Sequence, residues 1–523
     1  MLTFRSTLLL ALAGAFALSA ADPSAALAQS RKTKKKAATT HAKRKKPAKS
    51  RSRSSESPIA PAAHYTSPRS GGALASDLGL FLNRIRSGSW GVMVVSLSRG
   101  DTLFARNPGE PMRPASTMKL FTSGLAFDRF GTDYQFSTDV LRDGPVAADG
   151  TVRGNLILRG DGDPALSGRF MDGGPNAPMQ TLAKQIASAG IKRVTGDIVG
   201  DETGFDGQKI PDGWLTRYLG SSYAARVSAL SLDENLIWVA VGPGSGGKAN
   251  VTLEPATTVF PIINNARTVA GSGASIRTQK RSDGTIVVTG TIGSRAGTKR
   301  YSYVVDDPAM MATGALKAAL LANGVTVDGT VRLAPTPAGA TKVTSLQSPT
   351  LARMISAMNR ESLNHYAELL FRDATRGTDR KVQASAAAGN HAMRTFFQGF
   401  GADTATIFNA DGSGLSPNNR VTARAMVELL SHAHVSPWGP AFHASMPLAG
   451  ESELLRKRMK GSPAQGNLHA KTGTTNDVVS LAGYVTALNG EVIAFAFIYN
   501  GADRWTAKAS IDVMGETLAS FAR

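Results

Sequence analysis

Three short motifs, widely separated along the 523-residue chain, hold the residue types needed to activate a serine. In chain order they are Ser116-Thr117-Met118-Lys119, Ser362-Leu363-Asn364 and Lys471-Thr472-Gly473. A serine hydroxyl is inert near neutral pH unless a base takes its proton. A lysine three residues further along a helix lies on the same helix face as the serine. The first motif therefore predicts a nucleophile, Ser116, and a base, Lys119.

A lysine acts as a base only after it has lost its own proton. Burial and a neighbouring cation both lower the pKa of an amine, and we expect Lys471 to be the cation beside Lys119. Ser116 is predicted to begin a helix, so its backbone N–H points outward and can donate to a developing oxyanion. The first and third motifs are therefore expected to meet in one site.

The remaining side chains of the motifs suit proton transfer and substrate binding. Ser362 can pass a proton to a leaving amine, and Asn364 can hydrogen-bond the base and a substrate amide. Lys471 and Thr472 can present a cation and a hydroxyl to a substrate carboxylate. These residues complete the predicted site without a metal or a cofactor.

Gly473 and Thr474 are predicted to hold the substrate backbone. Because Gly473 has no Cβ, a peptide can lie close against its strand and pair with the strand edge. The backbone N–H of Thr474 is then the expected second donor to the oxyanion. A second Ser-x-x-Lys at Ser245–Lys248 lies in a Gly-rich turn with no helix after it, and we interpret it as structural.

Helices and strands alternate along the chain in a pattern that predicts an α+β fold. Strands are expected at 90–97, 102–105, 467–474, 478–487 and 491–499. Helices are expected from Ser116 and at 178–190, 308–323, 349–358, 363–372, 383–400, 422–434 and 504–521. The C-terminal strands and the helices around them predict an antiparallel sheet flanked by helices.

The distance between the first two motifs predicts a large insertion. Ser116 and Ser362 lie 246 residues apart, which is more than one catalytic domain needs between them. We therefore expect the two halves of one catalytic domain at 71–136 and 343–523, with inserted accessory domains at 137–342.

The N-terminal part of the chain predicts export. Arg5 and an apolar run precede small residues, as in a signal peptide over 1–28 that is cleaved after Ala28 or near Ala20. Residues 29–70 predict a disordered basic linker, in which 31–53 hold 12 Lys and Arg and no acidic residue. This tail is expected either to contact an anionic wall polymer or a membrane surface or to be a solvated spacer. No nucleic-acid partner is expected behind a signal peptide.

With these motifs in this order, the chain resembles a class C low-molecular-mass penicillin-binding protein, a D-alanyl-D-alanine carboxypeptidase/endopeptidase of peptidase family S13. The resemblance covers about 73–523. It includes the sequence from His469 to Thr474 and three accessory stretches. These are Gly162-Asp163-Pro164, Ser228-Ala229-Leu230-Ser231 with Asn235, and the six residues from Asp411 to Ser416.

The resemblance implies the serine β-lactamase/transpeptidase fold and nested accessory domains in the insertion. It implies an acylated Ser116, Lys119 as base, proton transfer assisted by Ser362 and Asn364, and a substrate carboxylate held by Lys471 and Thr472. The expected function is a secreted, periplasmic serine peptidase that hydrolyses peptidoglycan stem peptides and is inhibited by β-lactams.

Two other functions and one group of side chains stay open. A β-lactamase would need fast deacylation, and no glutamate for that step is identifiable in the sequence. A non-catalytic wall-binding scaffold would use the basic tail and the inserted domains. The aromatic side chains of Trp214, Tyr218 and Tyr223 either line the substrate pocket or pack the core of the insertion, and packing is the more frequent role.

Overall fold

The computed structural model describes residues 62–523 except 378 and 380. The predicted signal peptide, 1–28, and the basic stretch, 31–53, lie outside the described residues. None of the helices in the described part of the chain combines the length and the apolar composition that crossing a bilayer requires.

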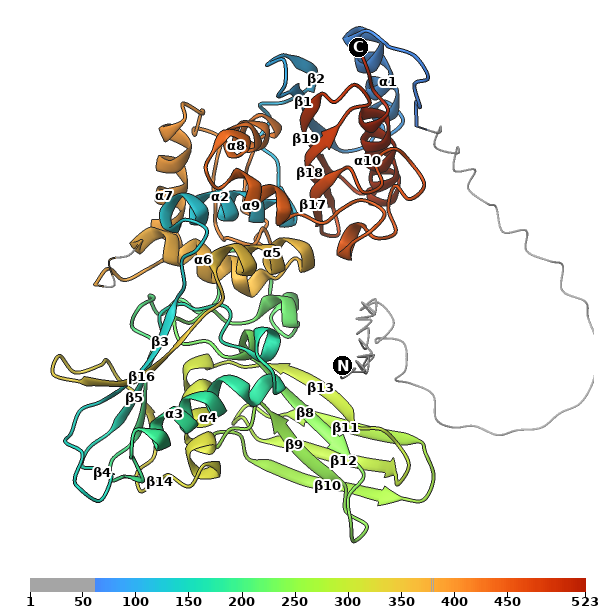
Figure 1. Ribbon diagram of the computed structural model, residues 1–523. Helices are drawn as coiled ribbons and strands as arrows, with labels where there is room; N and C mark the ends of the chain where they lie inside the picture. Colours follow the sequence, from blue (N-terminus) through green and yellow to red (C-terminus); the bar gives the residue numbers. More distant parts are fainter. Residues whose placement is uncertain (1–61, 378, 380) are drawn as a thin grey trace, which may run out of the picture. The chain divides into compact units, whose positions relative to one another are not determined.

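A five-stranded antiparallel sheet combines strands from the two ends of the described chain (Figure 1). In spatial order the strands are β17 (His469–Thr474), β18 (Val478–Thr486), β19 (Val492–Asn500), β1 (Ser89–Ser96) and β2 (Thr102–Arg106). β1 pairs with β19 along its whole length, from Ser89 opposite Asn500 to Ser96 opposite Ile493. The segments before and after the long middle part of the chain therefore share one sheet.

Helices cover both faces of this sheet. α1 (Gly71–Leu82) and α10 (Arg504–Ala519) pack on one face, and α8 (Ala423–Val435) packs on the other. Strand β18, which lies between β17 and β19, is buried from Val478 to Val485, because each face of the sheet has its own layer of apolar side chains. The structure confirms the predicted α+β fold with a helix-flanked antiparallel sheet.

A layer of helices that includes α8 surrounds one central helix, α2 (Met118–Phe130). The other helices of this layer are α5 (Leu351–Glu361), α6 (Asn364–Arg376), α7 (Ala386–Gly399) and α9 (Gly439–Ala444). In α2, every residue from Met118 to Phe127 is buried. A helix that is enclosed on all sides holds its first turn, with Lys119, and the turn directly before it, with Ser116, in a fixed position.

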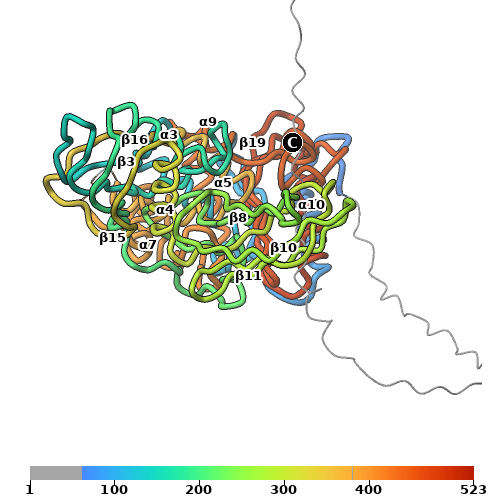
Figure 2. Tube along the Cα trace, turned by 90° about the horizontal axis from the view of Figure 1, so that it is seen from below, coloured from blue at the N-terminus to red at the C-terminus, as the bar shows by residue number. Residues whose placement is uncertain are grey.

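The middle part of the chain builds a second sheet with its own core. It consists of β15 (Val331–Leu333), β7 (Ile198–Asp201), β5 (Leu156–Arg159), β3 (Ser137–Arg142) and β16 (Thr341–Gln347) in spatial order. The chain enters it through β3 and leaves through β16, and these strands pair antiparallel, with Ser137 opposite Gln347. α3 (Ala177–Ser188) lies beside β16 in both views (Figure 2), and α4 (Pro308–Ala322) packs on β7.

Three smaller sheets complete the middle part. They are β13 (Lys299–Val304), β8 (Leu236–Gly242) and β9 (Asn250–Glu254); β10 (Ile262–Val269), β12 (Ile286–Gly293) and β11 (Ala274–Lys280); and β14 (Thr326–Val327), β6 (Arg193–Val194) and β4 (Thr151–Val152). Ser245–Lys248 lies in the turn between the paired strands β8 and β9. This position agrees with the interpretation that the segment has a structural role.

Candidate active site

Ser116 and Lys119 meet at the start of α2. Ser116 lies in a short 3-10 turn, Ala115–Thr117, that leads directly into the helix. Lys119 Nζ lies 3.1 Å from Ser116 Oγ, as the spacing of three residues predicts. The preceding residue, Ala115, has a φ of 49°, a left-handed conformation that is strained for a residue with a Cβ. The strain adjoins the serine hydroxyl, where backbone outliers commonly mark function.

The ammonium nitrogen of Lys119 is held by residues distant in the sequence. It donates to Asn364 Oδ1 at 2.6 Å and to the Ser413 carbonyl at 2.8 Å. Lys119 is fully buried, so these two acceptors and Ser116 Oγ replace water around Nζ. The structure therefore brings the first motif together with Asn364 of the second.

Ser362 and Lys471 form a second pair. Ser362 joins the end of α5 to the start of α6 in a left-handed conformation, with φ 61°, so that Ser362 and Asn364 flank the junction. Lys471 Nζ donates to Ser362 Oγ at 3.0 Å and to the Thr472 carbonyl at 2.8 Å. Lys471 is fully buried, and the structure thus joins the second motif to the third.

Burial and charge affect the two lysines differently. Burial lowers the pKa of Lys119 to about 7, while the Asp411 and Glu368 carboxylates act in the opposite direction. Burial also lowers the pKa of Lys471 well below its usual value, and the neighbouring charge of Lys119 lowers it further. Burial is thus the main cause of the lowered pKa of Lys119, and burial and the charge of Lys119 together lower the pKa of Lys471.

Gly473 also makes a close contact within the protein itself. A Cβ on Gly473 would meet Ser480 Oγ, the Pro114 carbonyl at 2.7 Å and the Ser116 nitrogen at 3.1 Å. The missing side chain therefore lets β17 pack directly against the turn that carries Ser116. It places the backbone of residue 473 beside the backbone N–H of Ser116.

The outer edge of β17 presents backbone donors to this site. Thr475 N–H points toward β18 and donates to the Val478 carbonyl at 3.0 Å. Ala470 N–H points away from β18 and donates to the Pro447 carbonyl at 3.2 Å. Since N–H directions alternate along a strand, the N–H of Thr472 and of Thr474 face the same outer edge as that of Ala470. The exposed Thr474 is therefore available to a bound molecule.

Two buried carboxylates shape the site without touching Ser116. Glu368 accepts from the backbone N–H groups of Gly412 and Ser413, at 3.2 and 2.9 Å. Asp411 accepts from those of Gly414 and Ser416, at 2.8 and 2.6 Å. Together they fold the 411–416 loop so that its Ser413 carbonyl faces Lys119.

The sequence alone indicates no role for Glu368, and the 411–416 stretch enters the sequence analysis only through the family resemblance. Burial, and then the neighbouring Asp411 charge, raise the pKa of Glu368 to about 8. The sequence contains one indication that Glu368 is important. The helical spacing of the apolar residues in α6 places Glu368, an acidic residue, on the buried side of an amphipathic helix.

A segment of the middle part of the chain closes the site from outside. Trp214 Nε1 donates to Asp411 Oδ2 at 2.8 Å, and Asn364 Nδ2 donates to the Tyr223 carbonyl at 2.8 Å. The second contact orients the Asn364 amide so that its oxygen, and not its nitrogen, faces Lys119. Trp214 is buried and Tyr223 is 46% exposed, so the three aromatic residues do not form one internal core.

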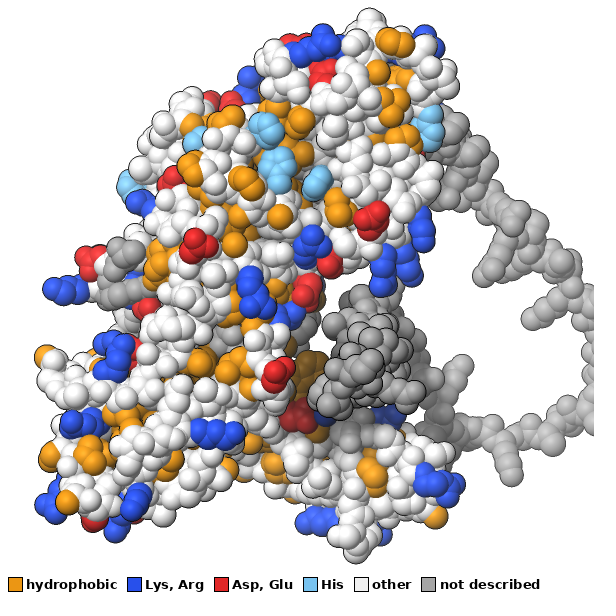
Figure 3. Space-filling model, in the orientation of Figure 1, with side chains coloured by type: hydrophobic (Ala, Val, Ile, Leu, Met, Phe, Trp, Pro, Cys, Tyr) orange, Lys and Arg blue, Asp and Glu red, His pale blue; other side chains and the backbone are white. Residues whose placement is uncertain are grey.

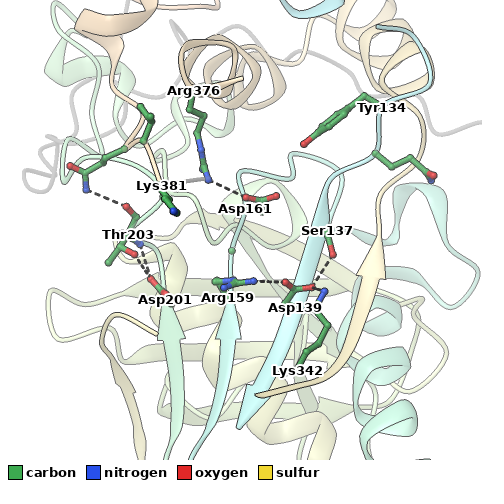
Figure 4. A pocket seen from close by; sticks show the side chains of 15 residues that line it. Tyr134, Ser137, Asp139, Arg159, Asp161, Asp201, Thr203, Lys342, Arg376 and Lys381 are labelled. Carbon is green, nitrogen blue, oxygen red and sulfur yellow. Dashed lines mark hydrogen bonds and ion pairs between the residues drawn. The ribbon is translucent and has the colours of Figure 1, made fainter. Parts of the chain in front are cut away.

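A separate cavity of about 450 Å³ lies between the second sheet and the segment that follows α6 (Figure 4). It shares no residue with the three motifs. Several of its charged side chains already pair with one another: Asp139 binds both Arg159 and Lys342, and Asp161 binds Arg376. Among all the described residues, those of this cavity included, no group of three or more His, Asp or Glu side chains is arranged to hold a metal ion.

Known proteins resemble the chain over most of its length. The model of a family described as the D-Ala-D-Ala carboxypeptidase 3 (S13) family matches residues 79–521. The D-alanyl-D-alanine carboxypeptidase of Actinomadura sp. (strain R39) is 35% identical over 449 residues, which are 83% of this chain and 81% of the relative. D-alanyl-D-alanine carboxypeptidase DacB of Haemophilus influenzae is 26% identical over 417 residues, 79% of this chain and 85% of the relative.

The fold also matches solved structures. The crystal structure of penicillin binding protein 4 (dacB) from Haemophilus influenzae aligns with a TM-score of 0.69 at 24% identity. The alignment covers 85% of this chain and 97% of that one. A second structure of the same protein, complexed with a β-lactam, aligns with a TM-score of 0.65.

Proposed function

The chain belongs to the D-Ala-D-Ala carboxypeptidase 3 (S13) family, and from this premise we propose that it cleaves peptidoglycan stem peptides through an ester on Ser116. The enzyme is a D-alanyl-D-alanine carboxypeptidase. The observation that carries the proposed mechanism is the buried contact of 3.1 Å between Lys119 Nζ and Ser116 Oγ.

In the acylation step, neutral Lys119 takes the proton of Ser116, and Oγ attacks the carbonyl carbon of the penultimate D-alanine. The backbone N–H groups of Ser116 and Thr474 donate to the oxyanion as it forms. The proton that Lys119 has taken then passes through the Ser362 hydroxyl to the amine of the terminal D-alanine, so that the C–N bond breaks, the amino acid leaves and Lys119 is neutral again. Water, deprotonated by Lys119, hydrolyses the ester and restores the Ser116 hydroxyl.

Lys471 is proposed to bind the terminal carboxylate of the substrate, together with the Thr472 hydroxyl. Two ammonium groups in one buried site repel each other, so the free enzyme disfavours protonation of both lysines. A bound carboxylate favours the charged form of Lys471. The charged Lys471 in turn favours a neutral Lys119, and substrate binding thereby helps to produce the base.

Labelling with a fluorescent penicillin tests the nucleophile. We expect the wild-type enzyme to form a covalent adduct that survives denaturation, and Ser116→Ala to form none while keeping its folded structure by circular dichroism. The structure of the similar penicillin binding protein 4 from Haemophilus influenzae in complex with a β-lactam supports this expectation. An unlabelled wild type, or equal labelling of Ser116→Ala, would contradict the proposed nucleophile.

Cleavage of D-alanyl cross-links is proposed as a second reaction of the same site, because it breaks the same type of peptide bond. Mass spectrometry of purified muropeptides separates the two reactions, since a carboxypeptidase removes one D-alanine and an endopeptidase converts dimers into monomers. The lifetime of the penicillin adduct addresses the β-lactamase alternative, for which seconds or less would be expected.

The proposed location is the periplasm, after removal of residues 1–28, and the basic stretch 31–53 is proposed to hold the enzyme at an anionic wall or membrane surface. N-terminal sequencing of the exported protein tests the cleavage site. Deletion of 31–53 should release exported enzyme from the envelope fraction if the stretch is an anchor.

A further inference from the structure

The three-stranded sheet of β10, β12 and β11 exposes one entire face. Paired residues in neighbouring strands place their side chains on the same face, and Arg267 pairs with Thr291. Alternate residues along the strands continue that face, and most of them are exposed. Ile286 and Val288 point to the opposite face and are buried in the core of the middle part. No layer formed by the described residues therefore covers the outer face of this sheet.

The charge of this region is strongly positive. Residues 255–304 contain one acidic residue, Asp283, and seven cations. The seven are Arg267, Arg277, Lys280, Arg281, Arg295, Lys299 and Arg300. Lys and Arg side chains also appear where the space-filling view shows this part of the molecule (Figure 3).

Three neighbouring cations on this side of the sheet, Lys248, Arg267 and Arg277, have no counterion among the described residues. Lys248 lies directly opposite Arg267 in an isolated β-bridge, so their side chains share one side of the backbone. Arg277 stands on the same face two strands away. All three are exposed, and within the described residues none of them forms an ion pair. Like charges opposite each other are destabilising, and a bound anion would relieve the repulsion.

Aliphatic side chains flank these cations on the same face. Ile263 and Val269 lie on β10 at alternate positions from Arg267 and are 40% and 42% exposed. A soluble polyanion would use only the cations. The surface of a bilayer with anionic lipids would bind the cations through its headgroups and take the aliphatic side chains into the boundary of its acyl chains.

We propose that the outer face of the β10–β12–β11 sheet, together with Lys248, docks on a bilayer surface that contains anionic lipids. The docking is a binding function of the middle part of the chain, separate from the catalytic chemistry. It would orient the enzyme on the membrane through residues that lie in none of the three motifs.

Vesicle co-sedimentation of the full chain tests the proposal. The vesicles are phosphatidylcholine alone or phosphatidylcholine with phosphatidylglycerol, at physiological ionic strength. The triple variant Lys248→Gln, Arg267→Gln, Arg277→Gln should bind the anionic vesicles about 100-fold more weakly than wild type, at about fivefold for each cation. Penicillin labelling of Ser116 should be unchanged.

A charge-matched control separates a local surface from net charge. Arg86, Lys184 and Lys192 are exposed cations on other elements. The triple variant Arg86→Gln, Lys184→Gln, Lys192→Gln should keep binding within about threefold of wild type. Equal losses in the two triple variants would overturn the proposal, because only the total charge would then matter. The N-terminal basic stretch is present in every variant, so the two triple variants are compared against the same background.

The aliphatic side chains distinguish a bilayer from a soluble polyanion. Ile263→Asn with Val269→Asn should weaken vesicle binding about fivefold to tenfold, whereas Leu80→Asn with Leu488→Asn, at two exposed sites elsewhere, should not change it. If the first pair binds vesicles as wild type does, and soluble polyphosphate competes fully, the surface binds polyanions and the bilayer proposal is wrong.

Discussion

Lys119 and Lys471 are both fully buried in one site, but their surroundings differ. Lys119 has two amide-type oxygens as acceptors and the carboxylates of Asp411 and Glu368 nearby. Lys471 has a hydroxyl and one carbonyl as acceptors, and in the described part of the chain the charge that acts on its pKa is that of Lys119. The protein itself completes the environment of Lys119, whereas the environment of Lys471 suits an anion supplied by the substrate.

The largest expected effect comes from removing the base. Lys119→Met keeps the length of the side chain but cannot accept a proton, and the acylation rate should fall about 10³-fold or more. The rate of penicillin acylation, followed by stopped-flow fluorescence, measures this loss. A variant that acylates within tenfold of wild type would show that Lys119 is not the base.

Lys471→Met should chiefly weaken recognition of the substrate carboxylate. The wild type should cleave a stem peptide with a free terminal carboxylate about 10²-fold better, in kcat/KM, than the same peptide with a terminal amide. The variant should lose most of this preference, because the preference depends on the buried cation. If the variant still prefers the acid by the wild-type factor, another group binds the carboxylate.

Trp214→Phe tests the contact between the middle part of the chain and the lysine network. The substitution leaves Asp411 Oδ2 without its indole donor in a buried place, and the 411–416 loop then holds Lys119 less firmly. We expect acylation to slow about fivefold to tenfold with little change in KM. Trp505→Phe is the matched control, since Trp505 is 68% exposed and should give wild-type rates. Equal rates in the two variants would contradict a positioning role.

The smallest expected effect is a shift in pH dependence. The rate of acylation should rise with pH as Lys119 loses its proton, with the midpoint near its pKa of about 7 in the free enzyme. The Asp411 charge raises the pKa of Lys119, so Asp411→Asn should move the rising limb of the pH–rate profile to lower pH. Glu368 and Lys471 are the other titratable groups that face Lys119, and both are unchanged in this variant. Asp283→Asn, on a distant turn, should leave the limb in place. An unshifted limb in Asp411→Asn would show that its charge does not reach the base.

Local sequence patterns were sufficient for most of the elements around the site. The 13-residue helix α8, for example, has apolar residues at helical spacing and Thr422 as a capping residue, whose side chain accepts from Ala425 N–H. α9 was not predicted, because six residues with a proline in the first turn give too few turns for a periodic pattern. Gly473 indicated a close approach, but the sequence could not show that its neighbour was the Ser116 turn.

The sequence by itself determined the reactive groups and their family, because a hydroxyl, an amine and a glycine are each properties of one residue in a short local motif. Only the tertiary structure decided how the amine is held. Two of the groups that orient it are main-chain carbonyls, of Ser413 on Lys119 and of Tyr223 on Asn364. Every residue carries such a carbonyl, so no letter of the sequence marks the one that is used. The lowered pKa of Lys119 likewise follows from burial, which exists only once the distant segments have packed around it.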